Sequence, residues 1–362
     1  MEAEPGTEFE RMKHSYQRYI SKKLSFIILF TATAVVAIGL EICLGKYEIG
    51  FFESYQVLFD HIRGITPQGD LGRMKDYVVW DLRFPRAIAG LTVGATLGAC
   101  GAAMQSALKN PLADPYTTGI SSGASLGAAI AIILGISIIP TVTGQWGIVT
   151  NAFVFSLIPA AVIVLVMKFK RAGPTSMILI GIAVMYVFSA TTSLLMLTAE
   201  PDALAEVYIW NVGTLGKATW SNISFLIAAA ISVILLLQLV AKKLNILVMS
   251  DEGATALGVN PRALRLYSLI IVSLTTSLVV SFTGTIGFVG LIAPHVVRMF
   301  IGSDNRYLLP ASAAFGGAML LCADCIAKEA GATGLPVGVI TALIGGPLFL
   351  LLLMRQRRSA WK

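Results

Sequence analysis

Apolar stretches of about 20 residues recur along the chain, and short polar segments separate them. An α-helix of about 20 residues is long enough to cross the hydrocarbon core of a bilayer. The pattern therefore predicts an all-α membrane protein with about ten transmembrane helices, near residues 24–44, 86–107, 119–138, 147–168, 174–198, 219–241, 266–282, 286–301, 308–327 and 336–354. The span at 286–301 is the weakest, because glycines loosen its start and Pro294 is expected to break its middle.

Glycines recur every four residues in two of these spans, at Gly90, Gly94 and Gly98 and at Gly119, Gly123 and Gly127. This spacing leaves one helix face without side chains, so another helix can pack closely against it. The chain is interrupted at 110–115 and at 284–294. Such breaks survive in a membrane only where protein or water satisfies the backbone, so they favour a translocation route. The other packing or pathway candidates are Gln105, Gly287, Gly290, Pro294 and His295.

The charges predict how the chain is oriented. Only 13% of the 362 residues are charged and 56% are hydrophobic, as in a polytopic membrane protein. With a cytoplasmic N-terminus, 19 of the 27 basic residues fall on the inner side, which the positive-inside rule favours. We therefore expect a multi-pass protein of the cell membrane with both termini cytoplasmic. Residues 1–23 are then a charged cytoplasmic segment, 24–354 the ten-span membrane domain and 355–362 a basic cytoplasmic tail.

Three connections are long enough to hold structure of their own. The outer segment 45–82 is mixed in charge and is expected to carry a helix or a partner surface. The outer segment 200–218 contains Tyr208 and Trp210, which suit a short helix at the membrane interface. The inner segment 242–265 is expected to form two short helices, the first ending at Gly258 and the second starting at Pro261. Such a pair would form a binding surface for a soluble partner.

No set of residues has the pattern of an active site. A phosphate-binding loop is absent from the sequence, so any ATP chemistry belongs to another chain. We interpret Cys322 and Cys325 as small buried side chains, and His295 as a structural group, rather than as metal ligands. The spans carry no chain of titratable groups for proton coupling. Three outer cations, Arg83, Arg86 and Lys328, are either interface anchors or docking points for an acidic partner.

Several motifs together resemble one family of membrane permeases. They are R-x-P-R at 83–86, M-Q-x-x-x-x-N-P-L-A-x-P at 104–115, G-x-I-G-F-x-G-L-x-x-P-H at 284–295 and L-P-x-G-x-x-T-A-x-x-G-x-P at 335–347. The chain is thereby similar to the FecCD family, the permeases of type II ATP-binding-cassette (ABC) importers. This resemblance implies a homodimer in the lipid bilayer, two ATP-binding subunits that use ATP and Mg, and one extracytoplasmic solute-binding protein. It implies no cofactor, metal or nucleic acid on this chain and no enzyme activity of its own.

The matching positions carry expected roles. The resemblance implies docking of the binding protein at Arg83, Arg86 and Lys328. It implies a cytoplasmic gate at Asn110, Leu112, Thr175 and Ser176. It implies ATPase coupling in the segment 250–265, at Asp251, Glu252, Ala254, Leu257, Gly258, Pro261 and Arg262.

The expected cargo is a metal chelate. An iron(III)-siderophore leads, with cobalamin or haem as alternatives and molybdate or tungstate less favoured. A stand-alone secondary transporter or channel, and a membrane-anchored sensor or scaffold, are the alternatives from other classes.

Overall fold

Helices are the only regular secondary structure in the described part of the chain. The computed structural model describes residues 5–169, 173–331 and 334–356. The long helices are α1 (Pro5–Cys43), α4 (Phe84–Leu108), α5 (Ile120–Leu134), α6 (Gly144–Phe169), α7 (Pro174–Met196), α9 (Trp220–Met249), α11 (Pro261–Thr283), α12 (Val289–Ile301), α13 (Asn305–Glu329) and α14 (Val337–Gln356). The short ones are α2 (Phe51–Ile62), α3 (Gly69–Tyr77), a π-helical turn η1 (Val78–Arg83), a 3₁₀ turn η2 (Pro115–Thr118), α8 (Pro201–Val212) and α10 (Asp251–Ala256).

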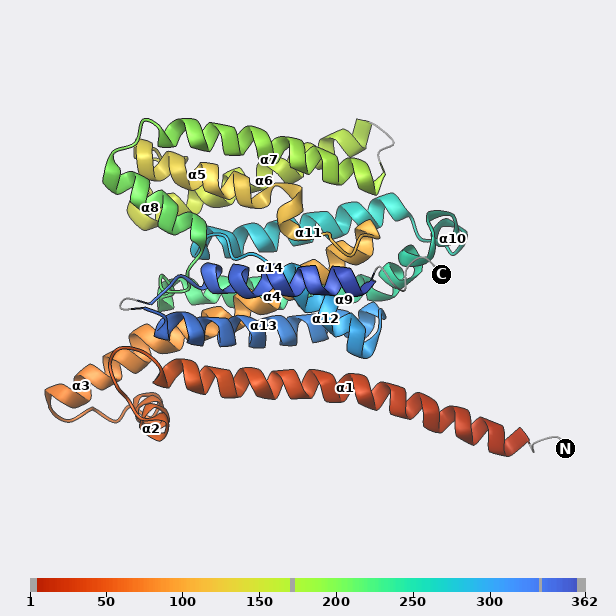
Figure 1. Cartoon of the computed structure of the whole chain (residues 1–362), viewed down its shortest axis with the longest axis horizontal. Helices are drawn as coiled ribbons and strands as arrows, with labels where there is room; N and C mark the ends of the chain where they lie inside the picture. Colours follow the sequence, from red (N-terminus) through yellow and green to blue (C-terminus); the bar gives the residue numbers. More distant parts are fainter. Residues whose placement is uncertain (1–4, 170–172, 332–333, 357–362) are drawn as a thin grey trace.

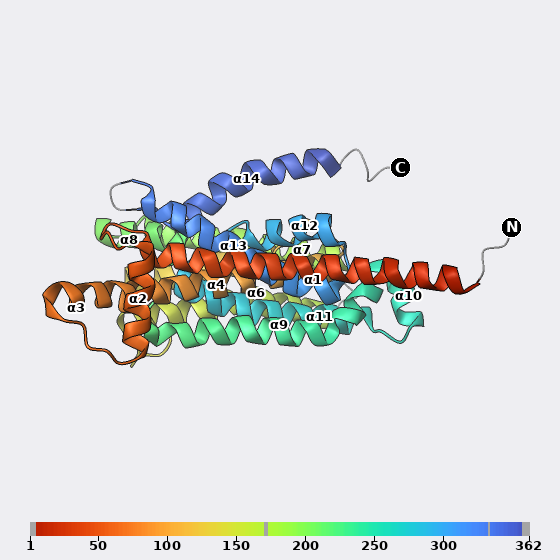
Figure 2. The ribbon, with the colours of Figure 1, turned by 90° about the horizontal axis from the view of Figure 1, so that it is seen from below.

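The long helices form one bundle with two distinct ends (Figures 1 and 2). Helices α2, α3 and α8 lie at the end that we call outer, and α10 lies at the opposite, inner end, following the orientation that the charges predict. The start of α1 and the end of α14 also lie at the inner end. The helices expected in the outer segments 45–82 and 200–218 are thus confirmed as α2, α3 and α8.

The apolar helices match the predicted spans in position. Among the described residues, seven helices are long and apolar enough to cross a membrane, and three shorter apolar helices cover 120–134, 289–301 and 337–351. Every predicted span overlaps one of these helices, while the count of ten crossings stays a prediction. Residues 1–4 of the charged N-terminal segment, and the basic tail from 357 onward, lie outside the described residues.

Helix α4 is the centre of the bundle. It packs against α13, α9, α12 and α11, and 89% of its most apolar window is buried. Its glycines allow direct backbone contact with α13, because a Cβ on Gly94 would lie 2.3 Å from the Gly316 carbonyl oxygen. A Cβ on Gly98 would lie 2.1 Å from the Ser312 oxygen. The glycine stripe is therefore confirmed as a packing surface.

The second stripe joins α5 to α6 in the same way. A Cβ on Gly123 would lie 2.5 Å from the Phe155 carbonyl oxygen, and one on Gly127 would lie 2.3 Å from the Asn151 oxygen. Gly119 instead sits at the start of α5 with φ of 88°, a conformation that favours glycine, and faces Gly181 of α7. These contacts assemble α5, α6 and α7 into one layer (Figure 1).

We expect Gly94→Ala to destabilise the protein. The added methyl group would meet backbone atoms of Gly316 and Gly317, so the two helices must separate. Overpacking of this kind costs about 1–3 kcal/mol, which exceeds the gain in helix propensity. The measurement is the thermal unfolding midpoint in detergent. Gly287→Ala is the matched control, because nothing lies within 4 Å of a Cβ there. Equal midpoints for the two variants would contradict the packing role.

Two features of the segment after the sixth predicted span differ from expectation. Helix α9 continues to Met249, because the stretch up to that residue contains no helix breaker and keeps leucines facing the core. The expected second short helix is not separate: Pro261 begins α11, with Asn260 as its N-cap. The inner segment therefore presents one short helix, α10, followed directly by a long one.

Near the N-terminus, α1 begins at Pro5 and runs unbroken through the charged segment.

The expectation that Pro294 breaks its helix was wrong, because α12 continues through this residue. The helix runs through Pro294 from Val289 to Ile301, and the interruption lies before it, where Phe288 adopts φ of 69°. A proline cannot donate to the carbonyl four residues earlier, here that of Gly290. That carbonyl oxygen lies 1.7 Å from where a Cβ on Gly101 would be, so α4 packs directly onto it.

Protein groups satisfy the interruption at 284–288. The Thr214 amide donates to the Thr283 carbonyl at 2.7 Å, and the Ile286 amide donates to the Tyr116 hydroxyl at 3.3 Å. Thr285 donates to the Asn211 carbonyl at the end of α8. The break is thus held by the outer segment 200–218 and by Tyr116 of η2, as backbone inside a membrane requires.

Candidate functional site

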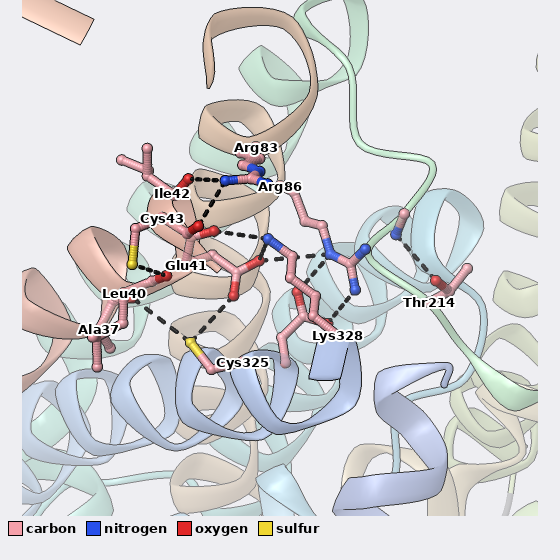
Figure 3. A network of polar contacts seen from close by, with 12 residues as sticks. Ala37, Leu40, Glu41, Ile42, Cys43, Arg83, Arg86, Thr214, Cys325 and Lys328 are labelled. Carbon is pink, nitrogen blue, oxygen red and sulfur yellow. Dashed lines mark hydrogen bonds and ion pairs between the residues drawn. The ribbon is translucent and has the colours of Figure 1, made fainter. Parts of the chain in front are cut away.

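Arg83 lies at the outer end of the bundle and is buried, with 6% of its surface exposed. It ends η1, and its Nη1 donates to the carbonyls of Ile42 at 2.9 Å and Cys43 at 2.7 Å. Its Nη2 donates to the Tyr47 carbonyl. The last carbonyls of a helix have no partner within it. Arg83 therefore caps the end of α1 from a different part of the chain (Figure 3).

Arg86 and Lys328 meet two buried acids beside Arg83 (Figure 3). The Nε and Nη2 atoms of Arg86 each donate to a carboxylate oxygen of Asp324 at 2.7 Å, a bidentate pair. Lys328 pairs with the Glu41 carboxylate and donates to its backbone carbonyl at 2.8 Å. Both acids are completely buried. Side chains from α1, α4 and α13 thus form one ionic cluster, which we call the outer cluster: Glu41, Arg83, Arg86, Asp324 and Lys328.

The outer cluster faces a hollow. Arg83, Arg86 and Lys328 all line one cavity of about 580 Å³, together with Lys46 and Asp81. The formal charges of the cluster are three positive and two negative, so one positive charge is uncompensated. The side chain of Arg86 is 21% exposed. The three basic residues therefore point inward as partners of buried groups, and they also give the cavity an excess of positive charge.

The acids of the outer cluster are functional residues that the sequence reasoning missed. Glu41 and Asp324 each lie near the outer end of an apolar helix, at the same level as the three cations. A buried acid in a span is costly unless it is paired. The two acids within apolar spans were therefore a signal in the sequence, because each of them requires a nearby cation.

One cysteine differs from the expectation that Cys322 and Cys325 are both buried. Cys325 is buried, and its Sγ donates to Glu41 at 3.3 Å. Cys322, however, is exposed.

The gate candidates lie at the inner end, in two places. Asn110 follows α4, and its Oδ1 accepts a hydrogen bond from the Leu112 amide at 2.9 Å, which fixes the turn. The Leu112 side chain is 42% exposed. Thr175 and Ser176 lie in the first turn of α7, and Ser176 donates its amide to the Gly173 carbonyl at 3.1 Å. Among the described residues, no hydrogen bond joins the two places.

The coupling candidates form a compact unit around α10. Ser250 caps the helix by accepting from the Gly253 amide at 2.8 Å, and Gly258 ends it with φ of 77°. Ala254 is fully buried and anchors the helix, whereas Leu257 is 65% exposed. Glu252 is also exposed. The helix thus presents an acidic and apolar face to the inner side.

The start of α11 completes this unit. Pro261 occupies its first turn, and Arg262 donates to the Met167 carbonyl at the end of α6. The seven expected coupling residues therefore lie in one continuous stretch of the inner end.

The pathway candidates lie between α4 and α12. Gln105 donates to the Leu291 carbonyl at 3.3 Å and accepts from Arg298 at 3.0 Å. His295 is buried on α12. Gly290 lies against Asp114, since a Cβ there would be 2.5 Å from its Oδ1. Among the described residues, no group of three or more His, Cys, Asp or Glu could hold a metal ion. These residues hold helices together, and nothing in their arrangement coordinates a ligand.

Helix α7 is the least buried of the long apolar helices. Only 11% of its most apolar window is buried, although the helix is 23 residues long. Its exposed side includes Tyr186, Ser189, Thr191 and Ser193 as well as large apolar residues. Exposed hydroxyls in the middle of a span are more costly in lipid than against protein or water. The large apolar residues of this face suit lipid, whereas its exposed hydroxyls favour a protein surface or water as a neighbour.

Comparison with known proteins gives a consistent result. The model of the FecCD transport family matches residues 32–355. A putative ABC transporter permease protein of Methanocaldococcus jannaschii is 37% identical over 351 residues, which cover 94% of this chain and 97% of that protein. A hemin transport system permease protein of Yersinia pestis is 36% identical over 222 residues, covering 61% of this chain and 66% of that protein.

A solved structure supports the fold. It is described as an inward-facing conformation of a putative metal-chelate type ABC transporter, and it matches with a TM-score of 0.79 at 27% identity. The match covers 91% of this chain and 99% of that chain. The similarity confirms the all-α permease architecture expected from the sequence.

Proposed function

The chain belongs to the FecCD transport family, and on this basis we propose that it is the membrane-spanning subunit of an ABC importer for metal chelates. Its relatives are named as permeases, not as enzymes. The proposal assigns ATP and Mg to two separate ATP-binding subunits. It assigns capture of the cargo to one extracytoplasmic binding protein.

The observation that carries the proposal is the exposed face of α7. A long apolar helix with 11% of its window buried leaves most of its surface free for lipid or a partner, and its exposed hydroxyls favour a partner or water over lipid. A second copy of the chain supplies both, with the cargo passing between the two α7 faces. Thr175 and Ser176 at the inner end of α7 would then meet their counterparts near Asn110 and Leu112 as a gate.

The outer cluster is the proposed dock for the binding protein. Its excess positive charge lines an open cavity, so acidic side chains of a partner are attracted to it. Arg86 and Lys328 already pair with buried acids of this chain, and this pairing sets what a docking carboxylate must displace. An incoming carboxylate competes with Asp324 for Arg86 and with Glu41 for Lys328, and it thereby loosens the contact between α1 and the core.

The cargo that we propose first is an iron(III)-siderophore, with cobalamin or haem as alternatives and molybdate or tungstate as less favoured. Curated relatives are named as permeases for cobalamin, molybdate, iron(3+)-hydroxamate and iron(3+)-citrate. Among the described residues, no cluster of His, Cys, Asp or Glu could hold a metal ion, which suits a passage where the binding protein provides the affinity.

Reconstitution tests the function. The chain is placed in liposomes alone, with its ATPase subunits, and with ATPase subunits and binding protein. Uptake of a ferric siderophore, haem, cobalamin and molybdate is then measured. We expect uptake only in the complete system with ATP. Uptake by the chain alone would identify a secondary transporter or channel. No uptake of any cargo by the complete system would favour a sensor or scaffold.

We expect a double substitution, Arg86→Met with Asp324→Leu, to weaken docking while leaving the fold intact. Replacing a buried ion pair with apolar residues of similar volume is often neutral for stability. The net charge of the outer cluster is unchanged, but the Arg86 guanidinium that an incoming carboxylate would pair with is gone, so binding-protein affinity should fall about 10-fold or more at low salt, and less at high salt. The control is Arg73→Met, at an exposed arginine on α3. Unchanged affinity at low salt would contradict the docking role.

A further inference from the structure

A single carboxylate at the inner end joins three helices. Asp251 is the first residue of α10, and its Oδ1 accepts from Lys109 Nζ at 2.8 Å and from Arg265 Nη2 at 2.7 Å. Its Oδ2 accepts from Arg265 Nη1 at 2.8 Å. Both oxygens are thus occupied by charged donors, one on α11 and one at the end of α4. Charge-assisted and bidentate bonds of this kind are short and directional.

The two cations connect Asp251 to the end of α4. Arg265 is 5% exposed, and its Nε donates to the Ala107 carbonyl at 2.9 Å, in the last turn of α4. Lys109 is the C-cap of α4 with φ of 51°, and the next residue is the gate candidate Asn110. A non-glycine residue in this conformation is held there by its surroundings. The carboxylate therefore reaches within one residue of the proposed gate.

The main packing of α10 lies elsewhere. The helix packs against α9 and α11. Its link to α4 runs through the side chain of Asp251, which makes that link directional and separable from the packing. Hydrogen bonds from Arg265 and then Lys109 hold the pKa of the Asp251 carboxyl well below its usual range. The link is consequently charged at any physiological pH.

We propose that Asp251 is the positioning residue that transmits the movement of α10 to the α4 end and so to the gate turn at 110–112. This inference rests on the proposed function and adds the element through which the ATPase controls the gate. When the ATP-binding subunits displace α10, the Asp251 carboxylate draws Lys109 with it. Arg265 keeps the carboxylate aligned, because it holds both oxygens and the α4 carbonyl at once.

The test uses the complete complex of permease, ATPase subunits and binding protein in liposomes. Asp251→Asn keeps the shape of the side chain and removes its charge. We expect the complex to assemble and to hydrolyse ATP, while the amount of cargo transported per ATP falls about 10-fold or more. Asp251→Glu retains the charge and should restore part of this ratio. Glu10→Gln, at an exposed acid on α1, is the control and should leave the ratio unchanged.

A second readout reports on the gate itself. Leu112→Cys carries an environment-sensitive label, and we expect ATP to change its signal in an otherwise wild-type complex. The change should disappear with Asp251→Asn, although ATP still binds. A purely structural role for Asp251 would move assembly or unfolding midpoint, but not transport per ATP.

A second variant keeps the proposal testable if Asp251→Asn fails to assemble. Lys109→Gln removes only the ion pair between Lys109 and Asp251 and leaves the pair of Asp251 with Arg265. It should lower transport per ATP in the same direction and by a smaller factor. A wild-type ratio for Lys109→Gln or for an assembled Asp251→Asn complex would overturn the inference. A wild-type complex without ATP-driven transport would instead overturn the proposed function.

Discussion

Asp324→Ala is expected to lower the stability of the permease by about 3–5 kcal/mol, the cost of leaving a buried charge without its partner. Asp324 is completely buried and accepts both bonds of Arg86. Removing it leaves the guanidinium near Glu41, which also pairs with Lys328. One buried acid would then face two cations, and the junction of α1, α4 and α13 would lose its balance of charge.

A double-mutant cycle distinguishes this ion pair from general damage to α13. The unfolding midpoint in detergent is measured for Asp324→Ala, for Arg86→Met and for both together. Because the two side chains act as a pair, the double variant should lose much less than the sum of the single losses. Asp202→Asn, at an exposed acid of α8, should leave the midpoint unchanged. Additive losses would show that the pair itself contributes nothing.

Leu257→Asp is expected to prevent productive assembly with the ATP-binding subunits. Leu257 directly follows α10 and is 65% exposed, while Ala254 within the helix is buried. A large apolar residue that a partner covers carries a disproportionate share of binding, about 2 kcal/mol or more, or about 30-fold in affinity. A carboxylate in its place would have to lose its water on binding. The fold should be unaffected, since the side chain contacts solvent.

Co-purification of the permease with its ATPase subunits measures this loss. Leu71→Asp is a closely matched control, because Leu71 is 64% exposed on α3 at the opposite end of the bundle. It should leave ATPase assembly intact. Wild-type assembly by the Leu257→Asp variant would exclude α10 from the ATPase interface.

Most spans were predictable because they are long apolar runs, and the glycine stripes predicted close packing. Helix ends were harder. The start of α1 and the end of α9 extend beyond the apolar runs as charged or amphipathic helix. A hydropathy pattern marks only the apolar runs, so it does not predict these helix ends. Pro294 misled because a proline removes only one hydrogen bond, and α4 packs against the carbonyl that it leaves.

The site was predictable residue by residue only in part. The span pattern placed Arg83, Arg86 and Lys328 at the same end of the bundle, and the structure brings them to one cavity there. Their partners depend on which levels of α1 and α13 meet α4, and Arg86 and Asp324 are 238 positions apart. A sequence alone does not specify such a register. The link from Asp251 to Lys109 also joins distant segments, 142 positions apart, and no spacing rule relates them.

The glycine contacts between α4 and α13 have a mechanical consequence. Two helices whose backbones touch along several turns slide or bend against each other only by breaking that contact, so they behave as one rigid unit. Helix α7 has no such attachment along most of its length. In the proposed importer, we therefore expect α4 and α13 to stay together as one rigid unit while the surrounding helices move against it, and the proposed gate turn lies at the end of that unit.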